Sequence, residues 1–336
     1  MTSATGIGSY PGTDQADYDE TVRAVLDELA GDHGLPHLPE IPGRGATATI
    51  TGRGLAVMAG LGADLQPAGW RLTGQGGPGV DHRRARSLLA QDLDVLEERA
   101  EGYAGTFKIQ VAGPWTLAAT VERPRGDKVL ADHGARRELA QALAEGVGEH
   151  VRDVRRRLPG ADRLVVQVDE PALAAVLGGK VPTASGFGRH RAVHPPEASE
   201  ALEWVLAAIT GAQAEPWVHS CAAGTPLPLL RGAGARGLSV DLATASAADH
   251  DTLAEALEAG ETVALGVVPA LDPARPPSDA SVTESVLRWL DMLGLDLAEV
   301  GERLVVTPGC GFAGATPSWA RRALGLLRTS AASLSG

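Results

Sequence analysis

Two cysteines and one histidine have the residue types and the spacing of a metal site. His219 and Cys221 are separated by one residue, Ser220, in EPWVHSCAAG, and Cys310 lies in VVTPGCGFAG. On an extended chain, residues i and i+2 point to the same side, so one imidazole and one thiolate can reach the same ion. Zinc binds such nitrogen and sulfur ligands, and a catalytic zinc keeps three protein ligands and an open position. We therefore expect zinc, with Cys310 as a distant third ligand. The alternative is that both cysteines are small buried hydrophobes.

Composition and charge exclude several classes of partner. The chain has 336 residues, with 42 acidic against 30 basic side chains and a net charge of −12. Such a surface repels phosphate backbones, so no nucleic-acid partner is expected. Two cysteines in so long a chain make no disulfide framework, which is typical of a reducing cytoplasm. No signal peptide and no apolar run of about 20 residues is visible, so no membrane partner is expected and the predicted location is cytoplasmic.

Strand and helix patterns alternate regularly from residue 107 onward. Each strand pattern is an apolar run, as expected for parallel strands that are covered on both faces. Eight strands are predicted, at 6–11, 35–39, 107–117, 162–173, 215–221, 235–243, 261–269 and 302–314. The main helices are predicted at 17–34, 82–103, 135–160, 197–211, 247–260, 278–294 and 316–334, with a further helix opening near residue 46. Residues 177–196 are predicted to be a long loop.

Eight such strands in a chain of this length favour an α/β fold of the (β/α)8 TIM barrel type. We expect a single domain over residues 1–336, with its core at about 5–330. A doubly wound open sheet is the alternative, but no G-x-G-x-x-G follows the first strand, which argues against a dinucleotide-binding domain.

Polar residues recur at the carboxyl ends of the predicted strands, where such barrels place their chemistry. Asp241 ends the strand after the His219 strand, and neighbouring strands lie about 4.8 Å apart, so its carboxylate can reach the same ion. The alternative for Asp241 is a cap on the helix that begins near residue 247, or a buried residue that organises the loop. Asp169 and Glu170 point to opposite faces, so one carboxylate is expected to face the barrel mouth and hold an ammonium group, while the other pins a loop.

Six motifs taken in order resemble the catalytic half of the cobalamin-independent methionine synthases. They are GSYP, IQVAGPWTL, VVQVDEPAL, HSC, SVDLA and PGCG, and the likeness runs from residue 5 to about 330. The wider superfamily of zinc thiol methyltransferases shares its barrel with uroporphyrinogen decarboxylase. The resemblance implies a Zn²⁺ ion held by His219, Cys221, Asp241 and Cys310. It also implies that Ser9 holds the carboxylate of an amino acid, that Asp169 meets its ammonium group, and that Glu40 is a second acidic contact.

Three departures from the family pattern stand out. The family usually has Glu where this chain has Asp241. The chain lacks the N-terminal half of the long synthases. Residues 266–273, GVVPALDP, contain no histidine where those enzymes carry the one that protonates the folate leaving group. This argues against direct use of methyltetrahydrofolate. Short single-barrel relatives take methyl groups from corrinoids, which makes a corrinoid protein an expected partner.

The predicted function is a zinc-dependent methyl transfer to a thiol, most simply from a corrinoid or methyltetrahydrofolate donor to homocysteine, giving methionine. A free thiol has a pKa near 8.5 and is mostly protonated at neutral pH, whereas the thiolate is the nucleophile. One alternative is alkyl transfer to another small thiol. A second is porphyrin decarboxylation, which needs no zinc and which the His-Cys-Cys pattern argues against. A third is a non-catalytic barrel that binds an amino acid or a metal.

Overall fold

The computed structural model describes residues 1–74 and 76–336. Its main sheet has seven strands in the order β1-β9-β8-β7-β6-β5-β4. Every neighbouring pair in this sheet is parallel. The strands are β1 (Ser3–Ala4), β4 (Gly105–Ala112), β5 (Ala161–Asp169), β6 (Glu215–Ser220), β7 (Gly237–Asp241), β8 (Thr262–Val268) and β9 (Leu304–Pro308). Six of the eight predicted strands are thus confirmed as strands of one sheet.

Residues 34–40 close this sheet into a barrel. They form isolated parallel bridges to the N-terminal segment, Ala4 to Gly34 and Ser9 to Glu40, and one to β4, from His37 to Lys108. Backbone hydrogen bonds accompany them: Leu35 N donates to Ala4 O at 2.8 Å, and Lys108 N donates to Pro36 O at 2.9 Å. The first two predicted strands, at 6–11 and 35–39, are therefore bridged segments rather than regular strands, but they fill the positions that complete a TIM barrel.

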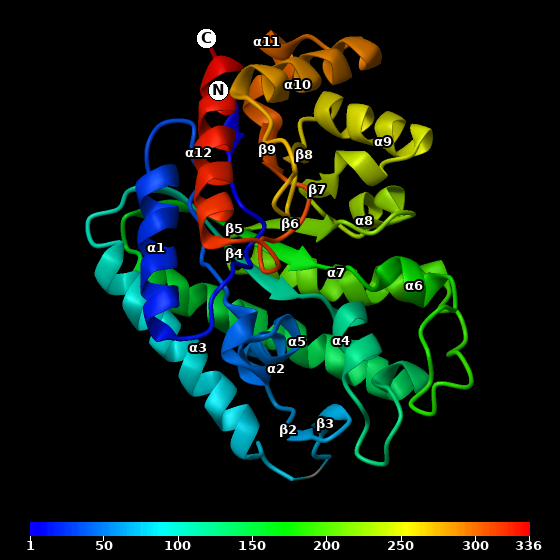
Figure 1. Ribbon diagram of the computed structural model, residues 1–336. Helices are drawn as coiled ribbons and strands as arrows, with labels where there is room; N and C mark the ends of the chain where they lie inside the picture. Colours follow the sequence, from blue (N-terminus) through cyan, green and yellow to red (C-terminus); the bar gives the residue numbers. More distant parts are fainter. Residues whose placement is uncertain (75) are drawn as a thin grey trace.

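Helices surround the barrel and alternate with its strands (Figure 1). They are α1 (Gln15–Leu29), α2 (Ile50–Val57), α3 (Val80–Arg99), α4 (Pro114–Thr120), α5 (His133–Arg157), α6 (Leu173–Leu177), α7 (Pro195–Gly211), α8 (Leu227–Gly232), α9 (Ala247–Glu258), α10 (Asp279–Leu293), α11 (Leu297–Val300) and α12 (Pro317–Ser333). Local sequence determines where some of them begin: Asp14 and Asp17 form a capping box on α1, and Thr316 caps α12 before Pro317.

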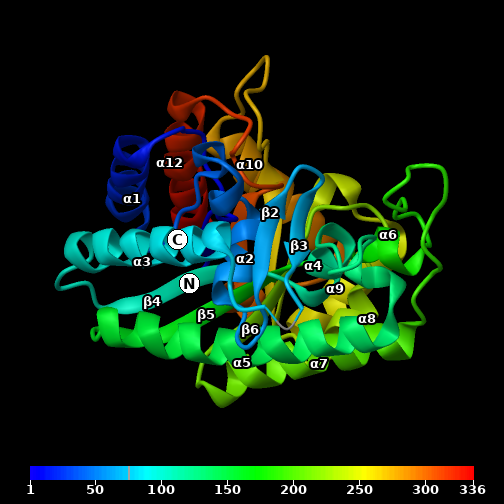
Figure 2. The same ribbon diagram turned by 90° about the horizontal axis from the view of Figure 1, so that it is seen from below.

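Helices α1 and α12, from opposite ends of the chain, lie side by side (Figures 1 and 2). Within the described residues, no helix is long and apolar enough to cross a membrane.

The segment between α2 and α3 differs from the sequence-based prediction. The helix expected from residue 46 onward is α2, which ends at Val57. It is followed by an antiparallel hairpin of β2 (Ala63–Gln66) and β3 (Gly69–Leu72), seen beside α2 in Figure 2. The hairpin was missed because its two strands have only four residues each, too few for a clear period-two pattern.

The barrel interior also differs, because its strands are not apolar on both faces. At its amino-terminal end, five apolar residues from separate strands form a small cluster: Leu35, Val165, Trp217, Ala264 and Val305. Above that cluster the inward side chains are polar. Lys108 is fully buried and donates from Nζ to Ile7 O at 3.0 Å and to Gln167 Oε1 at 3.1 Å. The outer faces of the strands pack against the helices in the main hydrophobic core.

A buried ion network joins the barrel to its helices. Asp92 of α3 accepts two hydrogen bonds from Arg44, at 2.8 and 2.7 Å, and one from Arg53 of α2, at 2.6 Å. Arg53 Nε lies 3.1 Å from Glu40 Oε1, and all four side chains are at most 7% exposed. Two cations and two carboxylates therefore balance each other, which offsets the desolvation cost of burying them.

This network predicts a large effect of Asp92→Ala. The substitution leaves two buried guanidinium groups without their shared carboxylate, and we expect the free energy of unfolding to fall by about 3–5 kcal/mol. Urea denaturation followed by circular dichroism measures it. Glu20→Ala, which removes the exposed pairs with Arg23 and Arg321, is the matched control and should cost less than about 1 kcal/mol. Equal losses in the two variants would contradict the role given to Asp92.

Candidate metal and amino-acid site

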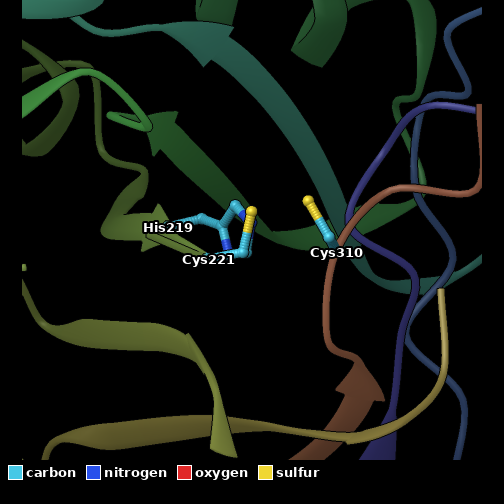
Figure 3. Close-up of side chains that lie close together, drawn as sticks. All are labelled: His219, Cys221 and Cys310. Atoms are coloured by element: carbon cyan, nitrogen blue, oxygen red, sulfur yellow. The ribbon is translucent and has the colours of Figure 1, made fainter. Parts of the chain in front are cut away.

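Three metal-competent side chains meet at the carboxyl end of the barrel. His219 lies on β6, Cys221 follows that strand directly, and Cys310 follows β9. One ligand atom from each lies within 4.8 Å of the other two, and both cysteines are free thiols. Figure 3 shows the imidazole ring and the two sulfur atoms facing the same space from the two strand ends. Residues 89 positions apart (310 − 221) thus converge as the sequence predicted.

The imidazole of His219 is oriented for ligation. Its Nδ1 lies 3.1 Å from the backbone oxygen of Ser239 and 3.0 Å from the hydroxyl of the same residue. A carbonyl oxygen can only accept, so Nδ1 carries the proton and Nε2 carries the lone pair. Nε2 is buried and has no hydrogen-bond partner among the described residues. A histidine whose one nitrogen is fixed by a backbone carbonyl while the other is free is the usual arrangement of a metal ligand, so these residues fit a zinc ion.

The two thiols differ in acidity. The neighbouring thiol of Cys221, together with His219, lowers the pKa of Cys310 to about 4, although burial opposes this shift. The same neighbour and burial raise the pKa of Cys221 above its ordinary value. Cys310 is therefore the more acidic of the two thiols, and the thiolate is the form that binds metals.

Two glycines let neighbouring side chains approach Cys310. A Cβ atom on Gly309 would lie 2.9 Å from the carboxylate carbon of Asp241, and one on Gly311 would overlap the hydroxyl of Ser9. Asp241 ends β7 as predicted, and its Oδ1 accepts a hydrogen bond from Ala243 N at 3.0 Å. Asp241 does not belong to the three-residue group that lies within 4.8 Å. Asp241 thus caps the short 3-10 helix Leu242–Thr244, whereas the helix near residue 247 is capped by Ser246, and the role of Asp241 as a ligand stays a prediction.

Asp169 ends β5, directly beside His219 in the strand register. It is 7% exposed, and Gln167 Nε2 donates to its Oδ1 at 2.7 Å. The pKa of Asp169 is raised to about 7, mainly by burial and also by the charge of Glu40, although His219, Gln167 and Lys108 act to lower it. A cation that entered here would stabilise the carboxylate, because an opposite charge nearby favours the ionised form.

Glu170 faces away from this site, as expected for the second carboxylate of the pair. Its Oε1 accepts from Trp115 N at 2.9 Å, and its Oε2 accepts from the backbone N and the hydroxyl of Thr116, both at 2.8 Å. These bonds fix the start of α4 to the end of β5. Burial raises the pKa of Glu170 to about 7 in spite of them. Glu170 is therefore a structural group.

Ser9 and Glu40 are neighbours across a single backbone bridge. Ser9 O accepts from Phe312 N at 2.7 Å, which ties Ser9 to the loop that carries Cys310. Glu40 is 5% exposed and is held through Oε1 by Arg53 Nε and by Gln110 Nε2, the latter at 3.0 Å. All seven residues singled out in the sequence thus lie at one end of the barrel, although their binding roles stay predictions.

Four polar residues that support the site were not singled out in the sequence. They are Arg53, Lys108, Gln110 and Gln167, and each bonds to a site carboxylate or to a residue that does. A signal was present for three of them. In FKIQVAG, Lys108 and Gln110 alternate with apolar residues, and Gln167 precedes Asp169 by two, so all lie on the inward faces of their strands.

Residues 106–333 match the model of the family described as cobalamin-independent synthase, catalytic domain. The chain belongs to this family. Among solved structures, it is similar to a B12-independent methionine synthase from Shewanella sp. W3-18-1 in complex with selenomethionine. The identity is 16%, the TM-score is 0.61, and the match covers 99% of this chain and 97% of the other, which supports the barrel fold. An endo-beta-1,4-mannanase from Cellulomonas fimi matches with 16% identity over 72% of this chain and 58% of its own, at a TM-score of only 0.40. No curated protein matches the chain.

The different environments of Asp169 and Glu170 predict different effects of substitution. Glu170→Ala leaves the buried N–H groups of Trp115 and Thr116 without an acceptor and should lower the free energy of unfolding by about 2–4 kcal/mol. Asp169→Asn keeps an acceptor for Gln167 and should change it by less than about 1 kcal/mol. Thermal and urea denaturation of both variants test this, and the reverse order would contradict the assignment.

Proposed function

We propose that the protein is a zinc-dependent methyltransferase of the methionine synthase type, which transfers a methyl group to the thiol of homocysteine. One observation carries this proposal: the buried, unpartnered Nε2 of His219 lies within 4.8 Å of the sulfur atoms of Cys221 and Cys310. Membership of the synthase family supports the same reaction class. The similar Shewanella enzyme is in complex with selenomethionine, the selenium analogue of methionine, which supports an amino acid of the methionine type as the ligand.

In this proposal, His219, Cys221 and Cys310 hold the ion, and Asp241 is the fourth ligand. Zinc, when bound, would keep the substrate sulfur as a thiolate, the form that attacks a methyl group. The residues of the chain fix the other end of the substrate. Ser9 binds its carboxylate, and Asp169 and Glu40 bind its ammonium group. Positioning of this kind can lower a barrier by several kcal/mol, because the reacting atoms no longer have to find each other.

The protein should therefore contain about one zinc ion per chain, measured by inductively coupled plasma mass spectrometry. Cys310→Ser should weaken zinc binding by more than about a hundredfold, which exceeds the 10–100-fold effect of losing an outer partner. Ser220→Ala is the matched control, because Ser220 lies between two proposed ligands but accepts a hydrogen bond from Thr225 at 2.8 Å instead. If Cys310→Ser keeps its zinc, Cys310 is a packing residue and the proposal fails.

The methyl donor is a separate proposal. Residues 266–273 span the end of β8 and the loop after it and contain no histidine. Within them, Asp272 accepts two hydrogen bonds from Thr316, from N at 2.8 Å and from the hydroxyl at 2.6 Å. This segment offers no obvious acid for a folate leaving group. We expect methylcobalamin to give methionine faster than methyltetrahydrofolate in a paired assay with homocysteine. A higher rate with methyltetrahydrofolate would overturn the preference for a corrinoid donor.

A purely metal-binding or amino-acid-binding barrel is the remaining alternative. It predicts tight zinc and ligand binding with no methionine formed from either donor, so the same assay separates it from the proposed enzyme.

A further inference from the structure

Gln110 leaves one buried acceptor without a donor. Its Nε2 donates to Leu38 O at 2.6 Å and to Glu40 Oε1 at 3.0 Å. Both of these oxygens can only accept, so chemistry fixes the orientation of the amide and the other atom must be Oε1. Gln110 is 4% exposed, and its Oε1 has no partner among the described residues. A buried polar atom of this kind calls for a bound group that donates to it.

The two site carboxylates show a complementary pattern. Oε1 of Glu40 accepts a hydrogen bond from Gln110 and is paired with Arg53. Oδ1 of Asp169 accepts a hydrogen bond from Gln167. The second oxygen of each carboxylate has no protein partner within the part of the chain that the structure describes. Gln110 and Gln167 are register partners on β4 and β5, so the two glutamines stand side by side and each holds one carboxylate.

Hydrogen bonds and strand register connect the three free acceptors. Standard C=O and C–N lengths put the two polar atoms of an amide about 2.2 Å apart. Because Nε2 of Gln110 is 3.0 Å from Glu40 Oε1, its own Oε1 lies within about 5 Å of that carboxylate. Asp169 is connected to the same group through the neighbouring strand, because Gln167, the register partner of Gln110, donates to its Oδ1 at 2.7 Å. Three acceptors without a protein partner among the described residues, Gln110 Oε1, Glu40 Oε2 and Asp169 Oδ2, therefore belong to one cluster of side chains.

We infer that Gln110 is the third acceptor for the substrate ammonium group, and that the site therefore selects a primary, unsubstituted α-ammonium. An –NH3⁺ group has three donors, one for each free oxygen, whereas an N-alkylated amine has fewer. This inference rests on the proposed function, which supplies the amino acid and the roles of Asp169 and Glu40.

The charges around the site explain why the third acceptor is an amide. Asp169 and Glu40 already repel each other, and a third buried carboxylate would increase that repulsion. A neutral amide adds an acceptor without adding charge. Lys108, which donates to Gln167 Oε1, has all of its observed bonds to neutral acceptors and so leaves the free carboxylate oxygens to the ligand.

The test compares two ligands by isothermal titration calorimetry on the full-length protein at pH 8. They are L-methionine and 4-(methylthio)butanoate, which lacks only the amine. Wild-type protein should bind L-methionine much more tightly. Gln110→Met should weaken L-methionine binding by about tenfold or more, because a hydrogen bond to a charged group is lost, and should leave 4-(methylthio)butanoate binding unchanged. N-methyl-L-methionine should bind wild-type protein more weakly than L-methionine.

Two further variants separate ligand contact from positioning. Gln110→Glu keeps an oxygen acceptor for the ligand, and the ammonium charge offsets the added carboxylate, so this variant should bind L-methionine more tightly than Gln110→Met. Equal loss in both variants would mean that Gln110 only positions Glu40, and would overturn the inference. Thr307→Val removes another buried unpartnered oxygen, on β9, and should leave the preference for the amine intact.

The outcomes also distinguish this inference from the function on which it rests. If wild-type protein binds both ligands equally, the amino-acid site itself is wrong and the proposed function fails with it. If wild-type protein prefers L-methionine and Gln110→Met keeps the full preference, only the role of Gln110 is wrong.

Discussion

Closure of the barrel through residues 34–40 is the constraint on which the site depends. This segment makes isolated bridges rather than a strand, yet it links the N-terminal residues to β4. Closure places Glu40 beside Ser9, whose segment is bonded to the Cys310 loop, and within reach of Gln110 on β4. Without it, groups from the two ends of the sheet would be separated by the full width of seven strands. The proposed site is thus a property of the closed ring and of no single motif.

The interior of this ring contains charged groups whose desolvation must be offset. Arg53 and Asp92 connect Glu40 to helices α2 and α3 through buried ion pairs, and Lys108 connects the amide of Gln167 to the backbone of Ile7. Arg53 is paired with only one oxygen of Glu40, and Lys108 bonds to the amide of Gln167 rather than to Asp169. The remaining oxygens stay available for a cation. The same arrangement that stabilises the buried charges therefore leaves acceptors free for the proposed ammonium group, which would bind with little rearrangement.

Sequence reasoning reached the barrel and the convergence of His219, Cys221 and Cys310, because parallel strands align their carboxyl ends and i,i+2 side chains share a face. It did not find the hairpin at 63–72, whose strands are too short for a period to show, or the polar interior. Lys108 was missed because a lone lysine in an apolar strand is ordinarily solvated, and its buried partners Ile7 and Gln167 are distant in sequence. Arg53 and Asp92 were missed for the same reason, since their pairing depends on how α2 packs on α3.

The central claim is that the three converging residues form a zinc site that accepts a substrate thiol. X-ray absorption spectroscopy at the zinc edge, on zinc-loaded protein with and without homocysteine, tests it most directly. The account predicts two sulfur neighbours at about 2.3 Å in the free protein, from Cys221 and Cys310, and three after homocysteine is added. An unchanged sulfur count on addition of homocysteine, or a zinc ion with no sulfur neighbours, would contradict it.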